Sequence, residues 1–259
     1  MDLFEAVPGV KGLQAMLHIK DLHNLLASPY NLLYYSKFKQ VLQTLEEFAA
    51  NQTRSPNTEV LLFQYFYTNR INAYFLEGRF TQGLTIIPDL LEQLERHKPQ
   101  LDLHRTLVLY YKIARPYFGS GEYARAIEYL NLIIQHKELS LREDPQCFAR
   151  ILNLIAHYEA GDDTSLDYQI RSVHHFPGKM DDQQPMRVEI FRFLRTVGSI
   201  APHEVREAFI RLRDKLIVIA ATPYESRPFL YLDIVSWLES KISNVPVQEV
   251  MQRKFRGMK

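Results

Sequence analysis

Apolar residues recur at three- and four-residue steps along most of the chain, which is the spacing of amphipathic helices. In residues 58–76 the stripe includes Leu62, Tyr67, Ile71 and Phe75. Similar stripes occupy residues 103–118, 144–158, 187–197, 203–221, 228–242 and 247–255. Strand-like alternation is scarce, and no Asn-Gly or Asp-Gly hairpin turn occurs. The pattern predicts an all-α fold.

Turn-forming residues separate these stretches. Residues 51–57 are predicted to form a loop, with Asn57 or Thr58 as the N-cap of the next helix. Further breaks are predicted at residues 98–99, 119–121, 161–163 and 176–178. The segment 178–185 is the most polar connection and is therefore the predicted hinge.

A short motif recurs at these breaks. Gly78-Arg79-Phe80-x-x-Gly83 aligns without a gap with Gly121-Glu122-Tyr123-x-x-Ala126. Ser36-Lys37-Phe38 fits the same frame, and residues 161–163 form a weaker fourth copy. The aromatic positions 38, 80 and 123 lie 42 and 43 residues apart, a period typical of stacked helix pairs. The glycine is expected to end a first helix in a left-handed conformation, and the aromatic residue to open the second helix.

The best copy resembles a tetratricopeptide (TPR) repeat. It reads Tyr110-x-x-Ile113-Ala114-x-x-Tyr117-Phe118-x-x-Gly121-Glu122-Tyr123-x-x-Ala126-Ile127-x-x-Leu130. Two departures are a period longer than the roughly 34 residues of standard TPRs and Pro116, which predicts a kink in the first helix. Segments around Cys147 and Trp237 are similar to those of uncharacterised bacterial TPR-like proteins.

This resemblance covers residues 30–245 approximately and implies an α-α superhelix without indicating an activity. We expect about four TPR-like helix pairs over residues 13–176. A C-terminal helical segment over residues 186–256 is expected to continue the array.

Composition and charge exclude several classes of partner. Lys+Arg 31 and Asp+Glu 30 give a net charge of +1, so no strong overall field favours nucleic acid or a membrane surface, and we expect neither as a partner. Cys147 is the single cysteine, which excludes an intrachain disulfide. The longest apolar run is residues 216–221, far short of the ~20 residues that span a membrane, and the N-terminus lacks a secretory pattern. We therefore expect a cytoplasmic protein.

Catalytic motifs are mostly absent, so we expect no enzyme, no cofactor and no metal. Gly119-x-Gly121 lacks the third glycine of a dinucleotide loop. His203-Glu204 begins a zinc-protease motif, but Glu207 occupies the position of its second histidine. A metal-dependent hydrolase that uses His174, His175 and nearby carboxylates is the least favoured alternative, because adjacent helical residues point roughly 100° apart.

Polar residues remain on the predicted first helices once the apolar stripes are removed. The candidate partner-binding residues are Asn69, Asn72, Lys112, Arg115, Arg150, Asn153 and His157. Side by side in a superhelix they would line a concave groove that suits a carboxylate, an acidic peptide segment or a chain terminus. The alternative is an ordinary solvated helix surface.

These patterns predict a non-catalytic scaffold or regulatory module that binds a protein or peptide. Asparagines would bond the ligand backbone, while Lys112, Arg115 and Arg150 would pair with its acids. Reversing the charge of Lys112 and Arg115 together is expected to abolish binding while leaving the melting temperature nearly unchanged. The alternative function is a ligand-responsive sensor that hinges near residues 178–185 and becomes more compact when the ligand binds.

Overall fold

In the computed structural model the described residues are 8–51, 55–136, 143–162, 185–197, 200–201, 203–222, 229 and 232–257. Every regular element within them is helical, which confirms the all-α prediction. The helices are α1 (Pro8–Asn31), α2 (Tyr35–Asn51), α3 (Pro56–Glu77), α4 (Phe80–Gly83), α5 (Ile87–His97), α6 (Leu103–Ser120), α7 (Tyr123–Ile134), α8 (Glu143–Ala160), α10 (Pro185–Thr196), α11 (Val205–Ala220), α13 (Ile234–Ser243) and α14 (Val247–Gly257). Short 3₁₀ turns precede and follow α5.

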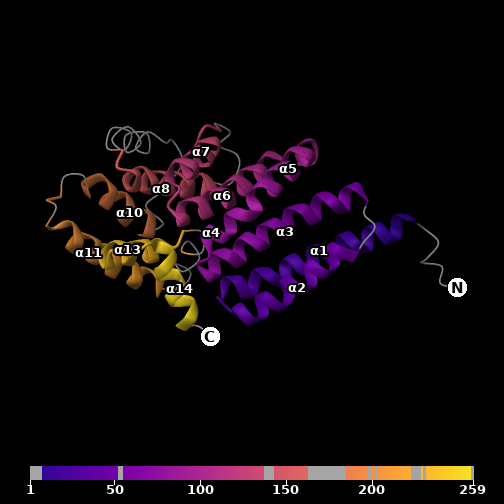
Figure 1. Cartoon of the computed structure of the whole chain (residues 1–259), viewed down its shortest axis with the longest axis horizontal. Helices are drawn as coiled ribbons and strands as arrows, with labels where there is room; N and C mark the ends of the chain where they lie inside the picture. Colours follow the sequence, from indigo (N-terminus) through magenta and orange to yellow (C-terminus); the bar gives the residue numbers. More distant parts are fainter. Residues whose placement is uncertain are drawn as a thin grey trace.

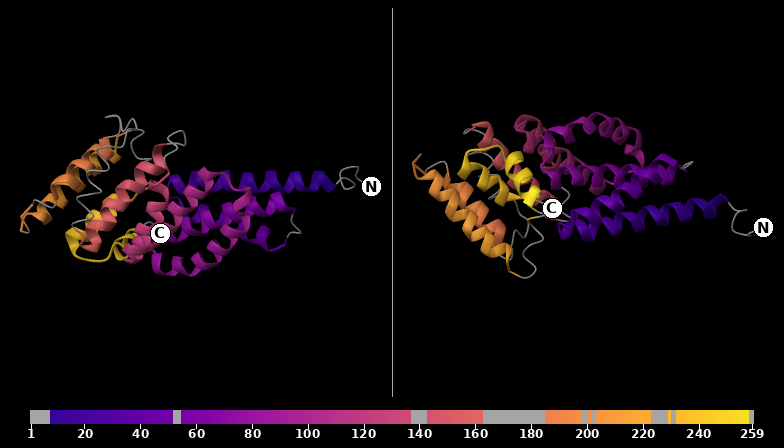
Figure 2. Two further views of the ribbon diagram at one scale, coloured as in Figure 1. Left: turned by 90° about the horizontal axis from the view of Figure 1, so that it is seen from above. Right: turned by 60° about the horizontal axis from the view of Figure 1, so that its bottom comes forward.

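The helices pack mainly against their neighbours in sequence, as in helical repeat proteins. Helix α1 contacts α2 and α3, α3 contacts α6, and α7 packs against both α6 and α8. The molecule is elongated, with α1 to α3 at one end and α10, α11 and α13 at the other (Figure 1). Helix α14 returns to the middle of the molecule, where it contacts α3 and α6 (Figures 1 and 2).

The repeated left-handed glycine turn is confirmed at Gly78 and Gly121, and Gly161, with a φ angle of 68°, follows the end of α8 in the same way. Gly78 and Gly121 have φ angles of 64° and 89°, and each ends a long helix in the left-handed conformation. The next residue is non-helical, and α4 and α7 begin directly at Phe80 and Tyr123. A side chain is excluded at position 78, because its Cβ would lie 2.7 Å from the backbone nitrogen of Gln252 in α14.

Two predicted boundaries are wrong. In the first copy of the motif the left-handed residue is Leu33, with φ 53°, and α2 begins at Tyr35, before Ser36. The N-cap of α3 is Ser55 rather than Asn57 or Thr58. The Ser55 side chain accepts a bond from the Thr58 backbone N–H, and Pro56 occupies the first helical position, where no backbone donor is needed.

Helix α3 is buried around most of its circumference rather than along one stripe. Its packing neighbours include α1, α2, α4, α6 and α14, which cover several of its sides. Buried positions therefore include polar residues such as Gln64, Asn69 and Asn72 as well as the apolar stripe. The central place of α3 brings its amides into contact with other helices.

One hydrophobic core continues across the predicted boundary between residues 176 and 186. It joins α6, α7 and α8 to α10, α11 and α13, and its members include Phe148, Ile190, Phe209 and Trp237. Cys147 is also buried in it, as the apolar stripe predicts. Most of the predicted hinge, residues 178–184, lies outside the described residues, and Pro185 begins α10.

Candidate functional site

Four of the predicted site residues lie together where α1, α3 and α6 pack. Lys112 Nζ of α6 donates to Asn72 Oδ1 of α3 at 2.5 Å. One turn away on α3, Asn69 Nδ2 lies 3.1 Å from His23 Nδ1 of α1. Arg115 completes the group, and we call His23, Asn69, Asn72, Lys112 and Arg115 the basic cluster.

Aromatic rings frame the basic cluster. The guanidinium carbon of Arg115 lies 3.4 Å from the centroid of the Phe75 ring, and its Nη1 donates to Tyr30 Oη at 3.4 Å. Lys112 Nζ lies 5.7 Å from the centroid of the same Tyr30 ring. On α1, the His23 ring stacks in parallel on Tyr65, with centroids 3.9 Å apart. These contacts hold both cations against π faces, which attract positive charge.

The basic cluster does not form the open groove that the sequence predicts. Asn69, Asn72 and Arg115 are buried, with 2%, 6% and 5% of their surface exposed, and Lys112 is half-buried. The physical reason is α1, which packs against α3 and contributes His23 and Tyr30 to the cluster. Solvent reaches the site mainly at the half-buried Lys112 and His23.

Electrostatics in the cluster favour uncharged bases. Burial, and then the nearby Lys112, lower the pKa of His23 to about 4. Asn69 Nδ2 donates towards His23 Nδ1, which fits a neutral ring whose Nδ1 is an acceptor. Burial, and then the charge of Arg115, hold the pKa of Lys112 well below its ordinary value. Within the described residues, the groups that interact with the Lys112 amine are an amide, a ring and a second cation, with no carboxylate among them.

The other three predicted site residues lie apart, on α8. Arg150 Nη2 donates to the carbonyl of Ile134, the last residue of α7, at 3.4 Å. Gln146 Nε2 donates to the carbonyl of His136 at 3.0 Å. Both side chains are buried and donate hydrogen bonds to carbonyls at the C-terminal end of α7. Arg150 therefore caps the C-terminus of α7.

Further along α8, two more of the predicted residues are buried. Asn153 is fully buried, and among the described residues neither its amide nitrogen nor its amide oxygen has a hydrogen-bond partner. His157 Nδ1 lies 3.3 Å from Asp162 Oδ2. Among the described residues, these three α8 side chains therefore form no hydrogen bond or ion pair with Lys112.

His23 and Tyr30 were missed by the sequence analysis. The two residues are seven positions apart, which places them on the same face of a helix, and this spacing was available as a signal. Tyr30 belongs to the same buried cluster as Ile19, Leu22 and Leu26, so His23 is a polar residue on an apolar helix face.

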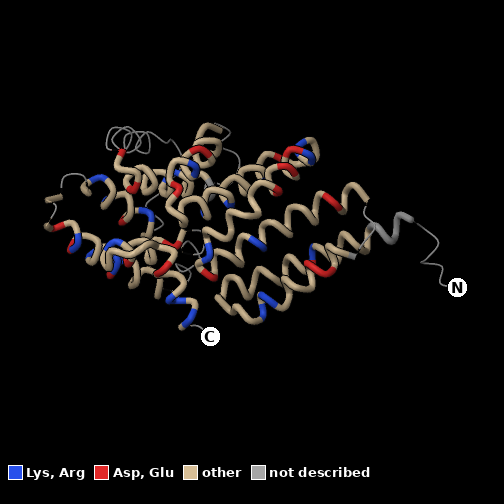
Figure 3. The backbone as a smooth tube through the Cα atoms, viewed as in Figure 1, with Lys and Arg blue, Asp and Glu red and all other residues tan. Residues whose placement is uncertain are grey.

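The charge distribution over the described residues is mixed. Figure 3 shows Lys and Arg interspersed with Asp and Glu along the helices. Among the described residues, no group of three or more His, Cys, Asp or Glu could hold a metal ion, while His174 and His175 lie outside that part of the chain. None of the described helices combines the length and apolarity needed to cross a membrane.

Comparison with known proteins does not assign a family or a function to this arrangement of residues. The TPR resemblance rests on the motif around Tyr123 and stays a prediction. In comparisons with protein-family models, curated proteins and solved structures, the chain has no significant match.

Proposed function

We propose that the chain is a non-catalytic scaffold or regulatory module that binds an acidic group of a protein or peptide partner at the basic cluster. The TPR-like superhelix of the sequence analysis is part of this proposal. It is supported by the two matching turns at Gly78 and Gly121 and by the packing of sequential helices. The buried positions of Asn69 and Asn72 assign these amides to holding the cluster rather than to lining an open surface.

The observation that carries the proposal is the environment of Lys112. Its amine interacts with Asn72 Oδ1, with the Tyr30 ring and with the neighbouring charge of Arg115. Removing an ammonium from water costs several kcal/mol unless an anion compensates it. A carboxylate from a partner would supply that anion and make a charge-assisted hydrogen bond.

Lys112→Met tests this function because it separates binding from stability. Methionine keeps much of the length of lysine but removes the amine, so the folded state no longer contains a half-buried base. We expect the melting temperature to stay the same or to rise slightly. Capture of partner proteins from a lysate of the source organism, followed by measurement of their affinity, should show that the variant has lost the acidic partner.

Lys98→Met is the matched control, because Lys98 is an exposed lysine that pairs with Glu95 three residues earlier on the surface. It should retain the partner with unchanged affinity. A partner that binds wild type and Lys112→Met equally would show that Lys112 is not the binding residue. A marked drop in the melting temperature of Lys112→Met would instead assign Lys112 to the stability of the fold.

A further inference from the structure

A cavity of about 330 Å³ lies between the N-terminal helices and the C-terminal helices. Its walls are formed by the end of α1 and the turn that leads into α2, the end of α3, the end of α11, Asp233 directly before α13, and α14. Five aromatic rings line it, those of Tyr30, Tyr35, Phe75, Phe229 and Phe255. Its size and apolar lining are those of sites that bind small molecules.

Helix α14 lines the cavity, and polar contacts hold it against the turn between α3 and α4. Gln252 Nε2 donates to the carbonyl of Gly78 at 3.0 Å. Gln248 Oε1 accepts from the backbone N–H of Thr81 at 2.9 Å. Phe255 packs edge-on against Tyr35, with ring centroids 4.6 Å apart. The cavity therefore has a defined shape on this side.

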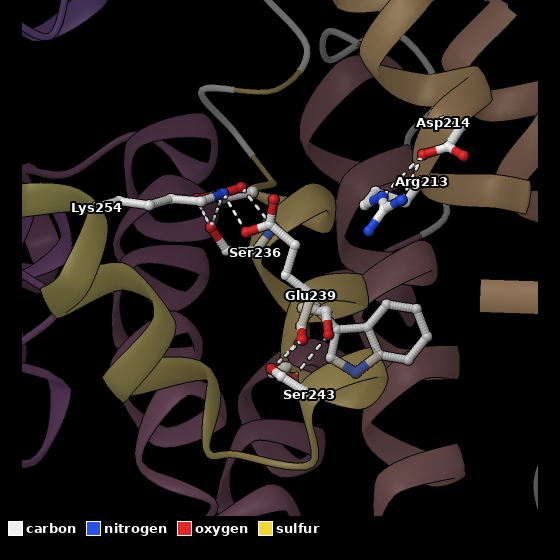
Figure 4. A network of polar contacts seen from close by, with 9 residues as sticks. Arg213, Asp214, Ser236, Glu239, Ser243 and Lys254 are labelled. Carbon is white, nitrogen blue, oxygen red and sulfur yellow. Dashed lines mark hydrogen bonds and ion pairs between the residues drawn. The ribbon is translucent and has the colours of Figure 1, made fainter. Parts of the chain in front are cut away.

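Two charged residues line the polar edge of the cavity, Lys254 and Asp233, and a neighbouring group offsets each of the two charges. Lys254 Nζ of α14 donates to Ser236 Oγ at 2.8 Å and lies 2.8 Å from Glu239 Oε2 of α13, as Figure 4 shows. Asp233 accepts from the backbone N–H and the hydroxyl of Ser236, at 3.0 and 2.6 Å. Asp233 also sits at the positive N-terminal end of α13, which offsets its charge.

This balance decides the class of ligand. An ammonium has three donors and a carboxylate has about four acceptor sites, so each group retains capacity beyond the bonds described. A charged ligand would meet one matching and one opposing group at this edge, whereas a neutral head that both donates and accepts would match both. We propose that the cavity binds a small uncharged molecule with an aromatic or aliphatic body and a hydrogen-bonding head such as an amide.

The site goes beyond the proposed partner binding and stands next to it. Tyr30 and Phe75 line the cavity and also contact Arg115 of the basic cluster. Occupation of the cavity would place a ligand against the rings that hold Arg115. A bound small molecule is also what the sensor alternative of the sequence analysis requires.

Three fluorinated probes of nearly equal size test the inference. They are 4-fluorobenzamide, 4-fluorobenzoate and 4-fluorobenzylamine, each titrated with the full-length chain and followed by fluorine NMR. We expect saturable binding of the amide, and binding of the benzoate and of the benzylammonium that is weaker by roughly tenfold. The full chain is used because residues from both of its ends form the cavity.

Ala220→Phe is the variant that fills the cavity, because Ala220 lines it from the end of α11. The matched control is Ala221→Phe, one residue further on at an exposed position outside the lining. We expect the first variant to weaken amide binding at least roughly tenfold and the control to leave it unchanged. A chain that does not bind the amide, equal binding by Ala220→Phe and Ala221→Phe, or preference for a charged probe would each overturn the proposal. Loss of the protein partner in Lys112→Met has no bearing on this result, so the two proposals can fail separately.

Discussion

The basic cluster and the polar residues of α8 contain similar residue types in different surroundings. On α8, Arg150 donates to carbonyls, including that of Ile134 at the end of α7. In the basic cluster, Lys112 donates to a neutral amide beside a second cation. The comparison shows that polar residues left over from an apolar stripe include two kinds. One kind completes the fold, and the other places a base where the described residues supply no carboxylate to pair with it.

The largest expected effect comes from reversing Lys112 and Arg115 to glutamate, and it corrects an expectation of the sequence analysis. Arg115 is buried against Phe75 and Tyr30, so two glutamates would bury negative charge against aromatic faces. We expect a loss of at least about 3–5 kcal/mol of stability, rather than an unchanged fold. Thermal unfolding followed by circular dichroism measures it.

The matched control for the reversal is Arg96→Glu with Lys98→Glu, since both side chains are more than half exposed at the end of α5. This pair should lose little stability. An unchanged melting temperature in the Lys112/Arg115 reversal would favour the open groove predicted from the sequence. It would also remove the contrast between the basic cluster and the polar residues of α8.

Arg150→Met should show the second-largest effect, and it acts on the α8 side of the comparison. Loss of the guanidinium leaves the carbonyl of Ile134 without this donor, with an expected cost of about 2–3 kcal/mol. Partner binding should persist at temperatures where the variant is folded. Chemical denaturation and a binding titration measure the two quantities, with Arg125→Met on the surface of α7 as the control.

If Arg150→Met is as stable as the wild type but no longer binds the partner, the binding site lies on α8 rather than at the basic cluster. Such a result would assign to Arg150 the role that the sequence analysis gave it, and would leave Lys112 with a purely structural one.

Local chemistry made much of the fold predictable. The turns at Gly78 and Gly121 follow from glycine's tolerance of positive φ, and their aromatic successors open the next helices as expected. Leu33 adopts the same left-handed region without glycine, so the sequence gives no signal for that turn. The loop predicted over residues 51–57 includes Pro56, which is instead the first residue of α3, so the N-cap lies at Ser55.

The site was predictable where its contacts follow the repeat. Lys112 and Asn72 are 40 residues apart, close to one period, so stacked first helices place them side by side. Tyr30 and Arg115 are 85 residues apart, close to two periods. Burial of the site was not predictable, because it depends on how closely α1 and α3 pack and on the central position of α3.

The next smaller effect is the loss of stability at acid pH, which we expect from His23 of the basic cluster. The pKa of His23 is about 4 in the folded chain and 6.5 without the environment of the cluster. Between these values the unfolded chain binds the proton and the folded chain does not. The contribution of His23 is therefore complete above pH 6.5 and is lost as the pH falls towards 4. We expect the free energy of unfolding to fall by about 2 kcal/mol over this interval, a value that allows for the partial exposure of the ring.

Denaturation midpoints measured from pH 7.5 to pH 4 give this dependence. His23→Gln should flatten the curve over this interval, whereas the same change at the exposed His203 should not. Equal slopes for wild type and His23→Gln would show that the His23 ring takes up its proton over the same pH range in the folded and the unfolded chain, and would argue against a lowered pKa of Lys112 beside it.

The smallest expected effect is a change in protonation when the partner binds. In the free chain, burial and the charge of Arg115 lower the pKa of Lys112. A partner carboxylate next to the amine raises that pKa again, so binding takes up at most about one proton and grows tighter as the pH falls. Titration calorimetry in phosphate and in Tris measures the uptake, because the two buffers release protons with different heats.

The His23→Gln background removes the other titrating group of the cluster, and Lys112→Arg, whose guanidinium stays protonated, should bind with no uptake. Equal heats in the two buffers for the chain that retains Lys112 would mean that its amine is already charged before the partner arrives. In that case the described groups that contact a full positive charge on Lys112 are the Asn72 amide and the Tyr30 ring, and the contrast with Arg150 would rest on geometry rather than on a missing counter-charge.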